Sequence, residues 1–351
     1  MKKGILILLW LAIVLTTTIS TSKVVVFASD DFAEKLQTNI SAKGTFILQT
    51  ANIGNEYNGI YNTYTTSLGI TKELGDNAKI TVNLKGGNGK VGDDHLATAS
   101  YATINKDASS KDLYVEVIYH HESFLCDRFN IDLGKFGISK YFDKNIYADD
   151  TSTQFLTGSF VSNKTIENLG DRSLGLRANY TLDKFDIDYG YFSYMNDKFD
   201  SKGFNILQIN YKPSKKENYR VYGWMDNGNT PEKDKPRGIG VSLDREINKQ
   251  VGVFTRFGYK DLSVLWSVGT QIKGSSWSRT NDTIGLATGQ IYKKEYTSDN
   301  KRHPETQIEL YYKLAINDNL AISPVLQYVA HPKGEAKENL FIYGMRTHFR
   351  F

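Results

Sequence analysis

The sequence predicts an all-β protein, a transmembrane antiparallel β-barrel of about 16 strands with a long inward-folding loop. Three observations support this fold. The chain ends in a strand of alternating character, similar alternation recurs along its length, and no apolar run after residue 27 is long enough for a membrane-spanning helix. The mean hydropathy is only −0.42, as expected when alternate residues of each strand face lipid. A water-soluble β-sandwich also alternates, and it is the alternative fold.

Bulky apolar residues occupy every second position of the final strand, apart from Thr347, with small or polar residues between them. The first set is Phe341, Tyr343, Met345, Phe349 and Phe351, and the second is Gly344, Arg346, His348 and Arg350. A period of two puts these sets on opposite faces. Closing strands of outer-membrane barrels end in an aromatic residue. We therefore expect this strand to pair with the first strand, near residues 44–51, and to address the chain to the barrel-assembly machinery.

The N-terminus has the pattern of a secretory signal peptide. Lys2 and Lys3 precede an apolar run over residues 4–19, and the sequence Val26-Phe27-Ala28 resembles a cleavage site. The alternative is a retained membrane anchor, but the run is shorter than the ~20 residues that a spanning helix prefers. We expect a signal peptide over residues 1–28 and an outer-membrane barrel domain over residues 29–351.

Composition limits the other function classes. The chain has 22 Tyr and 29 Gly but only 6 Pro, a balance that favours antiparallel strands and turns. Its single cysteine, Cys126, excludes an internal disulfide framework. Lys2, Lys3 and Lys23 fall in the expected signal peptide, so the net charge of +4 leaves the barrel nearly neutral. A nucleic-acid partner normally needs a basic excess. Any ion selectivity must come from the local placement of charges.

Alternation justifies each strand in turn. The short turn Asp183-Lys184 between two strands fits the periplasmic rim of a barrel. The expected strands cover residues 44–51, 59–70, 79–84, 113–120, 129–133, 174–182, 185–191, 203–212, 218–226, 238–245, 251–259, 264–272, 282–291, 308–314, 320–328 and 341–351.

One long stretch, from about residue 134 to residue 170, lacks this alternation. Asp143, Asp149 and Asp150 cluster there around Tyr141, Phe142 and Tyr147. A segment of this length is usually functional or disordered, and this one has many aromatic residues for a disordered segment. We predict that it folds into the lumen and forms a constriction; a plain extracellular loop is the alternative.

Three blocks of the sequence resemble the carbohydrate-selective porins of the OprB type. The first is residues 140–160, with Gln154-Phe155-Leu156; the second is residues 240–245, 251–259 and 282–287; the third is residues 305–312, 320–329 and 344–346. The first hundred residues match weakly. The resemblance implies an outer-membrane channel of sixteen strands that admits monosaccharides.

Strand parity identifies candidates for the lining of the lumen. Sugars are neutral and rich in hydroxyl groups, so a channel that favours them needs charged hydrogen-bonding side chains and aromatic faces. The candidates are Glu116, Arg177, Arg220, Trp224, Arg256, Gln271, Glu309 and Arg346. Trp224 is the candidate for stacking on a sugar ring. For each residue the alternative is an ordinary charged wall position.

Signals for catalysis and for cofactors are missing. His120 and His121 are adjacent and face opposite sides of a strand, and no nucleophile elbow, phosphate loop or zinc signature occurs. We therefore predict a channel with no enzymatic activity, no metal and no cofactor, whose partners are sugars and membrane lipid, as a monomer or a homotrimer. The rival functions are a general or small-ion porin, an outer-membrane hydrolase and an exported structural β-protein.

Overall fold

The computed structural model describes residues 38–52, 60–90, 114–124, 128–166, 173–194, 199, 202–228, 235–261, 263–292, 303–334 and 339–351. Residues 39–351 form one compact unit. The expected signal peptide and Cys126 lie outside the described residues.

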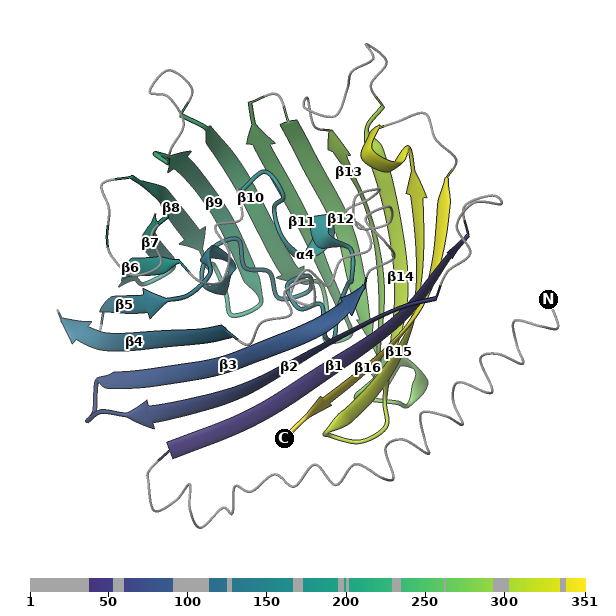
Figure 1. The fold of residues 1–351 in the computed structure, drawn as a ribbon, viewed down its shortest axis with the longest axis horizontal. Coiled ribbons are helices and arrows are strands. Elements are labelled where there is room, and N and C mark those ends of the chain that lie inside the picture. The colour runs from purple at the N-terminus through teal and green to yellow at the C-terminus, as the bar shows by residue number, and fades with distance from the viewer. Residues whose placement is uncertain are drawn as a thin grey trace. The chain divides into compact units, whose positions relative to one another are not determined.

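Sixteen strands form a closed barrel, in which each strand pairs antiparallel with its neighbours in the chain (Figure 1). The ring closes between the first and last strands, with Lys43 opposite Arg350 and Asn52 opposite Phe341. The predicted fold class and the predicted closing pair are therefore confirmed. The strands are β1 (Thr38–Asn52), β2 (Ile60–Glu73), β3 (Ala78–Lys90), β4 (Tyr114–Phe124), β5 (Phe129–Lys135), β6 (Leu174–Leu182), β7 (Phe185–Ser193), β8 (Gly203–Tyr211), β9 (Glu217–Asp226), β10 (Arg237–Glu246), β11 (Val251–Lys260), β12 (Ser263–Lys273), β13 (Thr283–Tyr292), β14 (Glu305–Ala315), β15 (Leu320–Ala330) and β16 (Leu340–Arg350).

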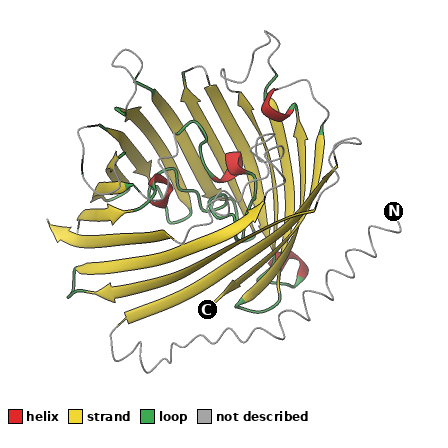
Figure 2. Ribbon diagram, viewed as in Figure 1, coloured by secondary structure: helices red, strands yellow, loops and turns green. Residues whose placement is uncertain are grey.

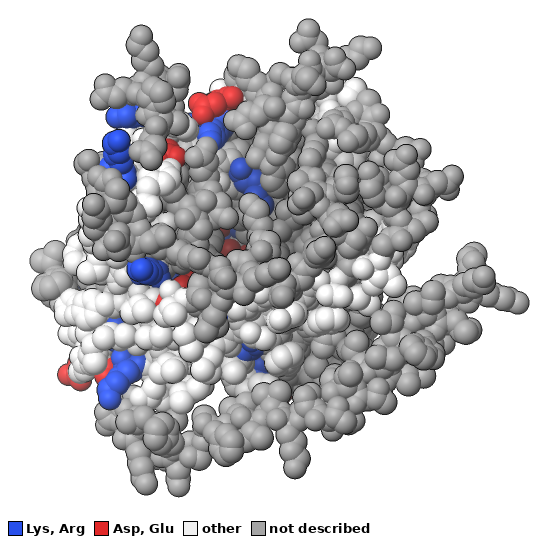
Figure 3. Space-filling model, viewed as in Figure 1, with Lys and Arg blue, Asp and Glu red and all other residues white. Residues whose placement is uncertain are grey.

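The alternation of the sequence becomes an apolar outside and a polar inside. On β16 the outward side chains of Phe341 and Tyr343 are 50% and 51% exposed, whereas Arg346 on the inner face is 0% exposed. Neighbouring strands keep the same parity, since Arg346 lies opposite Ile47 on β1 and Ser323 on β15. Wide stretches of the described surface in Figure 3 carry no charged side chain.

The connections at one end of the barrel are short. Asp183 and Lys184 alone join β6 to β7, and residues 316–319 join β14 to β15. Asp183 has a φ of +32°, a left-handed backbone conformation that aspartate tolerates better than most residues. Below, this end is called the short-turn end.

The stretch between β5 and β6 is called the insert, and its described part, residues 136–166 and 173, lies in the space that the strands enclose (Figures 1 and 2). It contains the 3-10 turn η2 (Ile138–Lys140) and the single-turn helix α4 (Gly158–Val161). The other single-turn elements are η4 (Gly274–Trp277) and η6 (Pro332–Gly334). Among the described residues, no helix is long and apolar enough to cross a membrane.

The insert folds inward because its aromatic side chains bury themselves against the inner wall. Phe142 packs with Phe192 and Tyr222 in one apolar cluster, and Phe155 packs with Phe254 and Tyr311 in another. Phe142 and Phe155 are both 0% exposed. The prediction of an inward-folding loop is therefore confirmed, and the core of the molecule lies inside the ring.

Glycines on the wall make room for these side chains. A Cβ atom added to Gly252 on β11 would lie 2.1 Å from the ring of Tyr147. One added to Gly190 on β7 would lie 2.6 Å from the ring of Phe142. Only glycine permits such a close approach between the wall and the insert.

Candidate functional site

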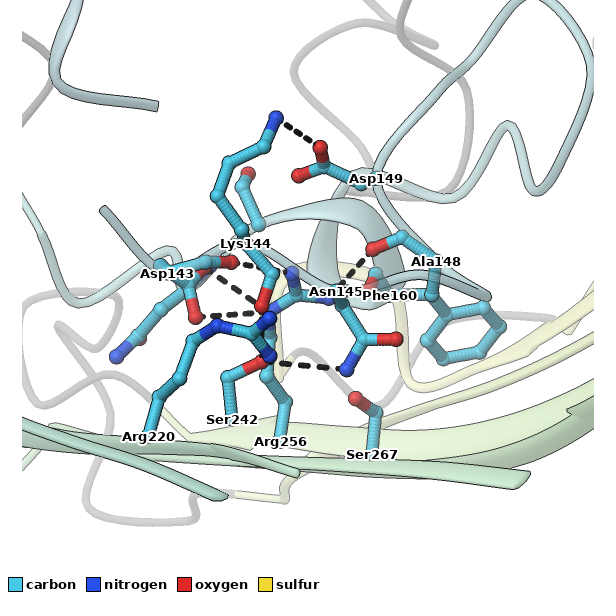
Figure 4. A network of polar contacts seen from close by, with 12 residues as sticks. Asp143, Lys144, Asn145, Ala148, Asp149, Phe160, Arg220, Ser242, Arg256 and Ser267 are labelled. Atoms are coloured by element: carbon cyan, nitrogen blue, oxygen red, sulfur yellow. Dashed lines mark hydrogen bonds and ion pairs between the residues drawn. The ribbon is translucent and has the colours of Figure 1, made fainter. Parts of the chain in front are cut away.

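The candidate site is the inner face of the barrel together with the insert. Arg256 on β11 forms the first connection between the two (Figure 4). Its Nε donates to both carboxylate oxygens of Asp143 at 2.9 Å, and its Nη2 donates to the Asp143 carbonyl oxygen at 2.6 Å. Its Nη1 donates to the carbonyl oxygens of Ala148, at 2.8 Å, and Phe160. Arg256 thus joins three separate points of the insert and is itself fully buried.

Asp143 has no carboxylate oxygen free for a solute. Besides Arg256, its carboxylate accepts hydrogen bonds from the Tyr222 hydroxyl at 2.8 Å and from the backbone N–H of Asn163 at 2.7 Å. Its own N–H donates to Oε1 of Gln208 at 3.0 Å. Asp143 has a φ of +56°, so these contacts hold an unusual backbone conformation at the centre of the network.

Glu309 on β14 forms the second connection. Its two carboxylate oxygens each accept a backbone N–H of the insert at 2.7 Å, from Leu156 and from Thr157. Gln327 donates to the same carboxylate at 3.2 Å and to the Thr157 hydroxyl at 3.0 Å. Glu309 is 0% exposed, so its charge is buried and satisfied by donors from the insert.

Arg346 and Gln271 complete the attachment. Nη1 of Arg346 donates to the carbonyl oxygens of Thr151 at 2.7 Å and Gln154 at 2.6 Å. Nε2 of Gln271 donates to the carbonyl oxygen of Tyr147 at 2.7 Å. Four of the eight predicted lumen residues, Arg256, Gln271, Glu309 and Arg346, therefore form hydrogen bonds with the insert.

Asp149 and Asp150 differ in their surroundings. Asp149 forms an ion pair with Lys144; burial raises its pKa, and Lys144 and Arg256 oppose that rise. Asp150 accepts hydrogen bonds from the N–H of Ser152, at 2.8 Å, and from the hydroxyl of Thr153, also at 2.8 Å. Burial alone would raise the pKa of Asp150, but the bonds from Ser152 and Thr153 outweigh it and lower that pKa. Asp150 thus closes a turn within the insert.

Across the ring, the inner faces of β2 and β3 carry hydroxyl and amide groups. Thr65, Ser67 and Thr71 on β2 pair in register with Gly87, Lys85 and Thr81 on β3. Thr65 and Ser67 are half-buried, and among the described residues their hydroxyls have no hydrogen-bond partner. The hydrogen bonds described above that join the insert to the barrel all go to β8–β16. This facing wall therefore keeps hydrogen-bonding groups that the insert does not occupy.

Charged residues of β3 to β7 lie along one edge of the facing wall that β2 and β3 form. Nζ of Lys85 is 2.7 Å from Oε1 of Glu116, which is buried beneath it. Arg177 lies 2.6 Å from Asp132 and 2.5 Å from Asp188. Its guanidinium also covers the ring of Tyr141 in the insert, 4.4 Å from the centroid. The Tyr141 hydroxyl donates to Asp132 at 2.9 Å, and His120 lies 2.7 Å from the same carboxylate.

Arg220 and Trp224 lie on β9 and are engaged with neighbouring strands. Nη1 of Arg220 donates to Asp244 at 2.5 Å. Trp224 is stacked on Phe204 at 5.5 Å between ring centroids and is 4% exposed, with the ammonium of Lys260 5.6 Å from its ring. The indole is thus buried within the protein, with one face stacked on Phe204.

All eight predicted lumen residues lie on inward-facing register positions, but they separate into three groups, of which Arg220 and Trp224, engaged with neighbouring strands, are one. Arg256, Gln271, Glu309 and Arg346 bind the insert, whereas Glu116 and Arg177 belong to the facing wall. The sequence analysis missed Lys85, Asp132 and the hydroxyls of β2. The alternation of Thr63, Thr65, Ser67 and Thr71 with Tyr64, Leu68 and Ile70 contained a signal for that polar face.

Comparison with known proteins agrees with this architecture. Residues 196–351 match the family model described as carbohydrate-selective porin, OprB family. An uncharacterized protein of Aquifex aeolicus (strain VF5) is 24% identical over 225 residues, which span 64% of this chain and 65% of that protein. The chain thus covers just under two thirds of the length of that relative.

Solved structures show the same fold. The high-pH structure of Pseudomonas putida OprB is similar with a TM-score of 0.76 and 15% identity, covering 92% of this chain and 96% of that one. A mutant of Rh. blastica porin is similar with a TM-score of 0.54 and 12% identity, covering 90% and 100% of the two chains. Porins are channels rather than enzymes and reside in the bacterial outer membrane. The described strands therefore share the sixteen-stranded barrel fold of these porins, and the C-terminal part of the chain, residues 196–351, is similar to the OprB carbohydrate-selective family.

Proposed function

We propose that this porin favours passive diffusion of glucose-like monosaccharides along a path between the insert and the facing wall of β2 and β3. The observation that carries the proposal is the hydroxyl pair of Thr65 and Ser67, which has no hydrogen-bond partner among the described residues and is half-buried on an inner face that the described contacts of the insert leave unoccupied. Lys85 and Arg177 flank this face.

The chemistry of this path suits an uncharged polyol. Hydroxyl side chains both donate and accept, so they pair with sugar hydroxyls in either role. Ion-paired Lys85 and Arg177 supply charge-assisted donors without a large net charge. Each contact is individually modest, and a channel needs binding weak enough to permit exit.

We assign different roles to the residues that the sequence analysis predicted. Arg177 and, through Lys85, Glu116 act on the solute. Arg256, Gln271, Glu309 and Arg346 set the position of the insert and with it the width of the path. Asp143 and Asp150 keep the constriction in shape, and the half-buried Asp149–Lys144 pair lies where a solute can reach it. Arg220 and Trp224 support the wall beside the insert.

The test is glucose block of single channels in planar bilayers, comparing the wild type with Thr65→Val and Ser67→Ala. Loss of one solute hydrogen bond costs roughly 1 kcal/mol, so each variant should weaken the block by about fivefold at unchanged conductance. Thr66→Val is the matched control, because Thr66 lies on the outward face of the same strand.

A wild-type current that millimolar glucose leaves unchanged would contradict the sugar preference and leave a general diffusion porin. Equal loss of block in Thr65→Val and Thr66→Val would contradict the proposed path.

We also propose that residues 1–28 are removed on export and that residues 29–351 form the mature domain. The strand that ends at Phe351 would be recognised by the barrel-assembly machinery. The assembled barrels would associate as trimers. Intact mass of the outer-membrane protein tests the cleavage, and a chain retaining residues 1–28 would contradict it. Deletion of Phe351 should lower the amount assembled. Cross-linking in membranes should give three-chain species.

A further inference from the structure

Lys140 is a lysine of the insert that has no partner for its charge among the described residues. Lys140 ends η2, and its ammonium has no hydrogen-bond or ion-pair partner among the described residues. It is half-buried and interacts electrostatically with Glu116, Lys85, Asp132 and Lys144. Lys140 therefore lies where the insert approaches the charged edge of the facing wall.

The other charges around Lys140 form paired groups. Lys85 pairs with Glu116, and Lys144 pairs with Asp149, so each of these pairs is neutral. Arg177 pairs with two carboxylates, Asp132 and Asp188, and these three side chains together carry one net negative charge. The single positive charge of Lys140 compensates that negative charge.

We propose that Lys140 brings this constellation to zero net charge and thereby makes the path favour uncharged solutes over ions of either sign. The proposal deepens the sugar-diffusion function above, and it rests on that function. Charged side chains that lie close together and sum to zero net charge can still form strong hydrogen bonds with the hydroxyl groups of a solute. An unbalanced charge in a narrow path would concentrate counter-ions there and repel ions of its own sign.

The proposal predicts opposite effects for two substitutions. Lys140→Gln leaves one net negative charge, and Glu116→Gln leaves one net positive charge. A unit charge about 6 Å from a permeating ion in water changes its relative occupancy by about threefold. The ratio of cation to anion permeability, obtained from the reversal potential in a KCl gradient, should therefore rise about threefold for Lys140→Gln and fall about threefold for Glu116→Gln. The double variant should return to the wild-type value.

Alkaline pH supplies an independent readout. Burial lowers the pKa of Lys140, with Glu116 opposing and Lys85 adding to the shift. As the pH rises through this lowered pKa, the wild type should move toward cation preference before ordinary lysines lose their charge. Lys140→Gln should lack this early change.

The controls are Lys184→Gln, in the exposed turn between β6 and β7, and Glu217→Gln, at the short-turn end of β9. The proposal is overturned if both single variants shift selectivity in the same direction, if the double variant does not compensate, or if Lys184→Gln has the effect of Lys140→Gln. The reversal potential is measured in the absence of sugar, so it tests the charge balance separately from the sugar function. A wild type without glucose block but with these opposite shifts would overturn the sugar function and sustain the charge balance.

Discussion

Replacing Arg256 by Gln should detach part of the insert and widen the channel. The change removes the bonds to Asp143, Ala148 and Phe160 and leaves the Asp143 carboxylate buried without its cation. Breaking a buried pair in this way costs about 3–5 kcal/mol. Since each 1.4 kcal/mol is tenfold, the ratio of attached to detached insert should fall by roughly a hundredfold or more.

The barrel itself should survive this change. Arg256 pairs through its backbone with Ser242 and Ser267, and a side-chain substitution leaves that ladder intact. Glu309 and Arg346 still bind the far part of the insert, so the loss concentrates near Asp143. The expected result is higher and noisier single-channel conductance with weaker glucose block. Trypsin should cut after Lys140 or Lys144 more readily, and heat-modifiable migration on gels should remain.

Two further variants separate this explanation from general damage. Arg245→Gln removes an exposed arginine at the short-turn end of β10, 3.7 Å from Glu217, and should leave conductance unchanged. Asp143→Asn combined with Arg256→Gln removes both charges and should cost less than the sum of the single changes. Wild-type conductance and protease resistance in Arg256→Gln would refute the positioning role.

Two other predictions concern the insert. Gly252→Ala should raise conductance, because its Cβ would lie 2.1 Å from the Tyr147 ring, whereas Gly223→Ala, with its nearest neighbour at 3.8 Å, should not; equal conductance in both would count against the close fit. The lowered pKa of Asp150 means that its charged form is preferred in the folded state, so its contribution to stability is present above the usual aspartate pKa and is lost as the pH falls through the lowered one. Denaturant unfolding should therefore show Asp150→Asn less stable than the wild type at neutral pH, with a difference that shrinks in acid; a difference independent of pH would contradict this assignment.

Strand parity allowed most of the barrel to be predicted from the sequence. All sixteen expected segments overlap strands of the structure, since an apolar outer face and a polar inner face enforce a period of two. The boundaries were less accurate where alternation fades. The first strand was expected over residues 44–51 but begins at Thr38, in a stretch of small and polar residues.

The roles of the inward residues were harder to predict, because parity does not tell open lumen from a wall covered by the insert. Arg256 and Glu309 have the sequence pattern of pore-lining residues, yet the insert occupies their hydrogen-bonding groups. The inward-facing glycines Gly190 and Gly252 could have indicated which part of the wall the insert covers, because a position without a side chain leaves room for an aromatic ring of the insert. The proposed role of Lys140 could not be predicted from the sequence, because it depends on charges from β3, β4 and β5 that only the folded chain brings together.

The division between the two walls makes pore width and solute affinity separable properties. Changes at Arg256, Glu309 or Gly252 act on the position of the insert, so they should alter conductance first and sugar block only as a consequence. Changes at Thr65 or Ser67 leave the insert in place, so they should alter sugar block at constant conductance. Because the two groups lie on different strands and share none of the contacts described above, their effects should add when a variant from each wall is combined. Strong non-additivity between Arg256→Gln and Thr65→Val would mean instead that the insert and the facing wall act on the solute as one site.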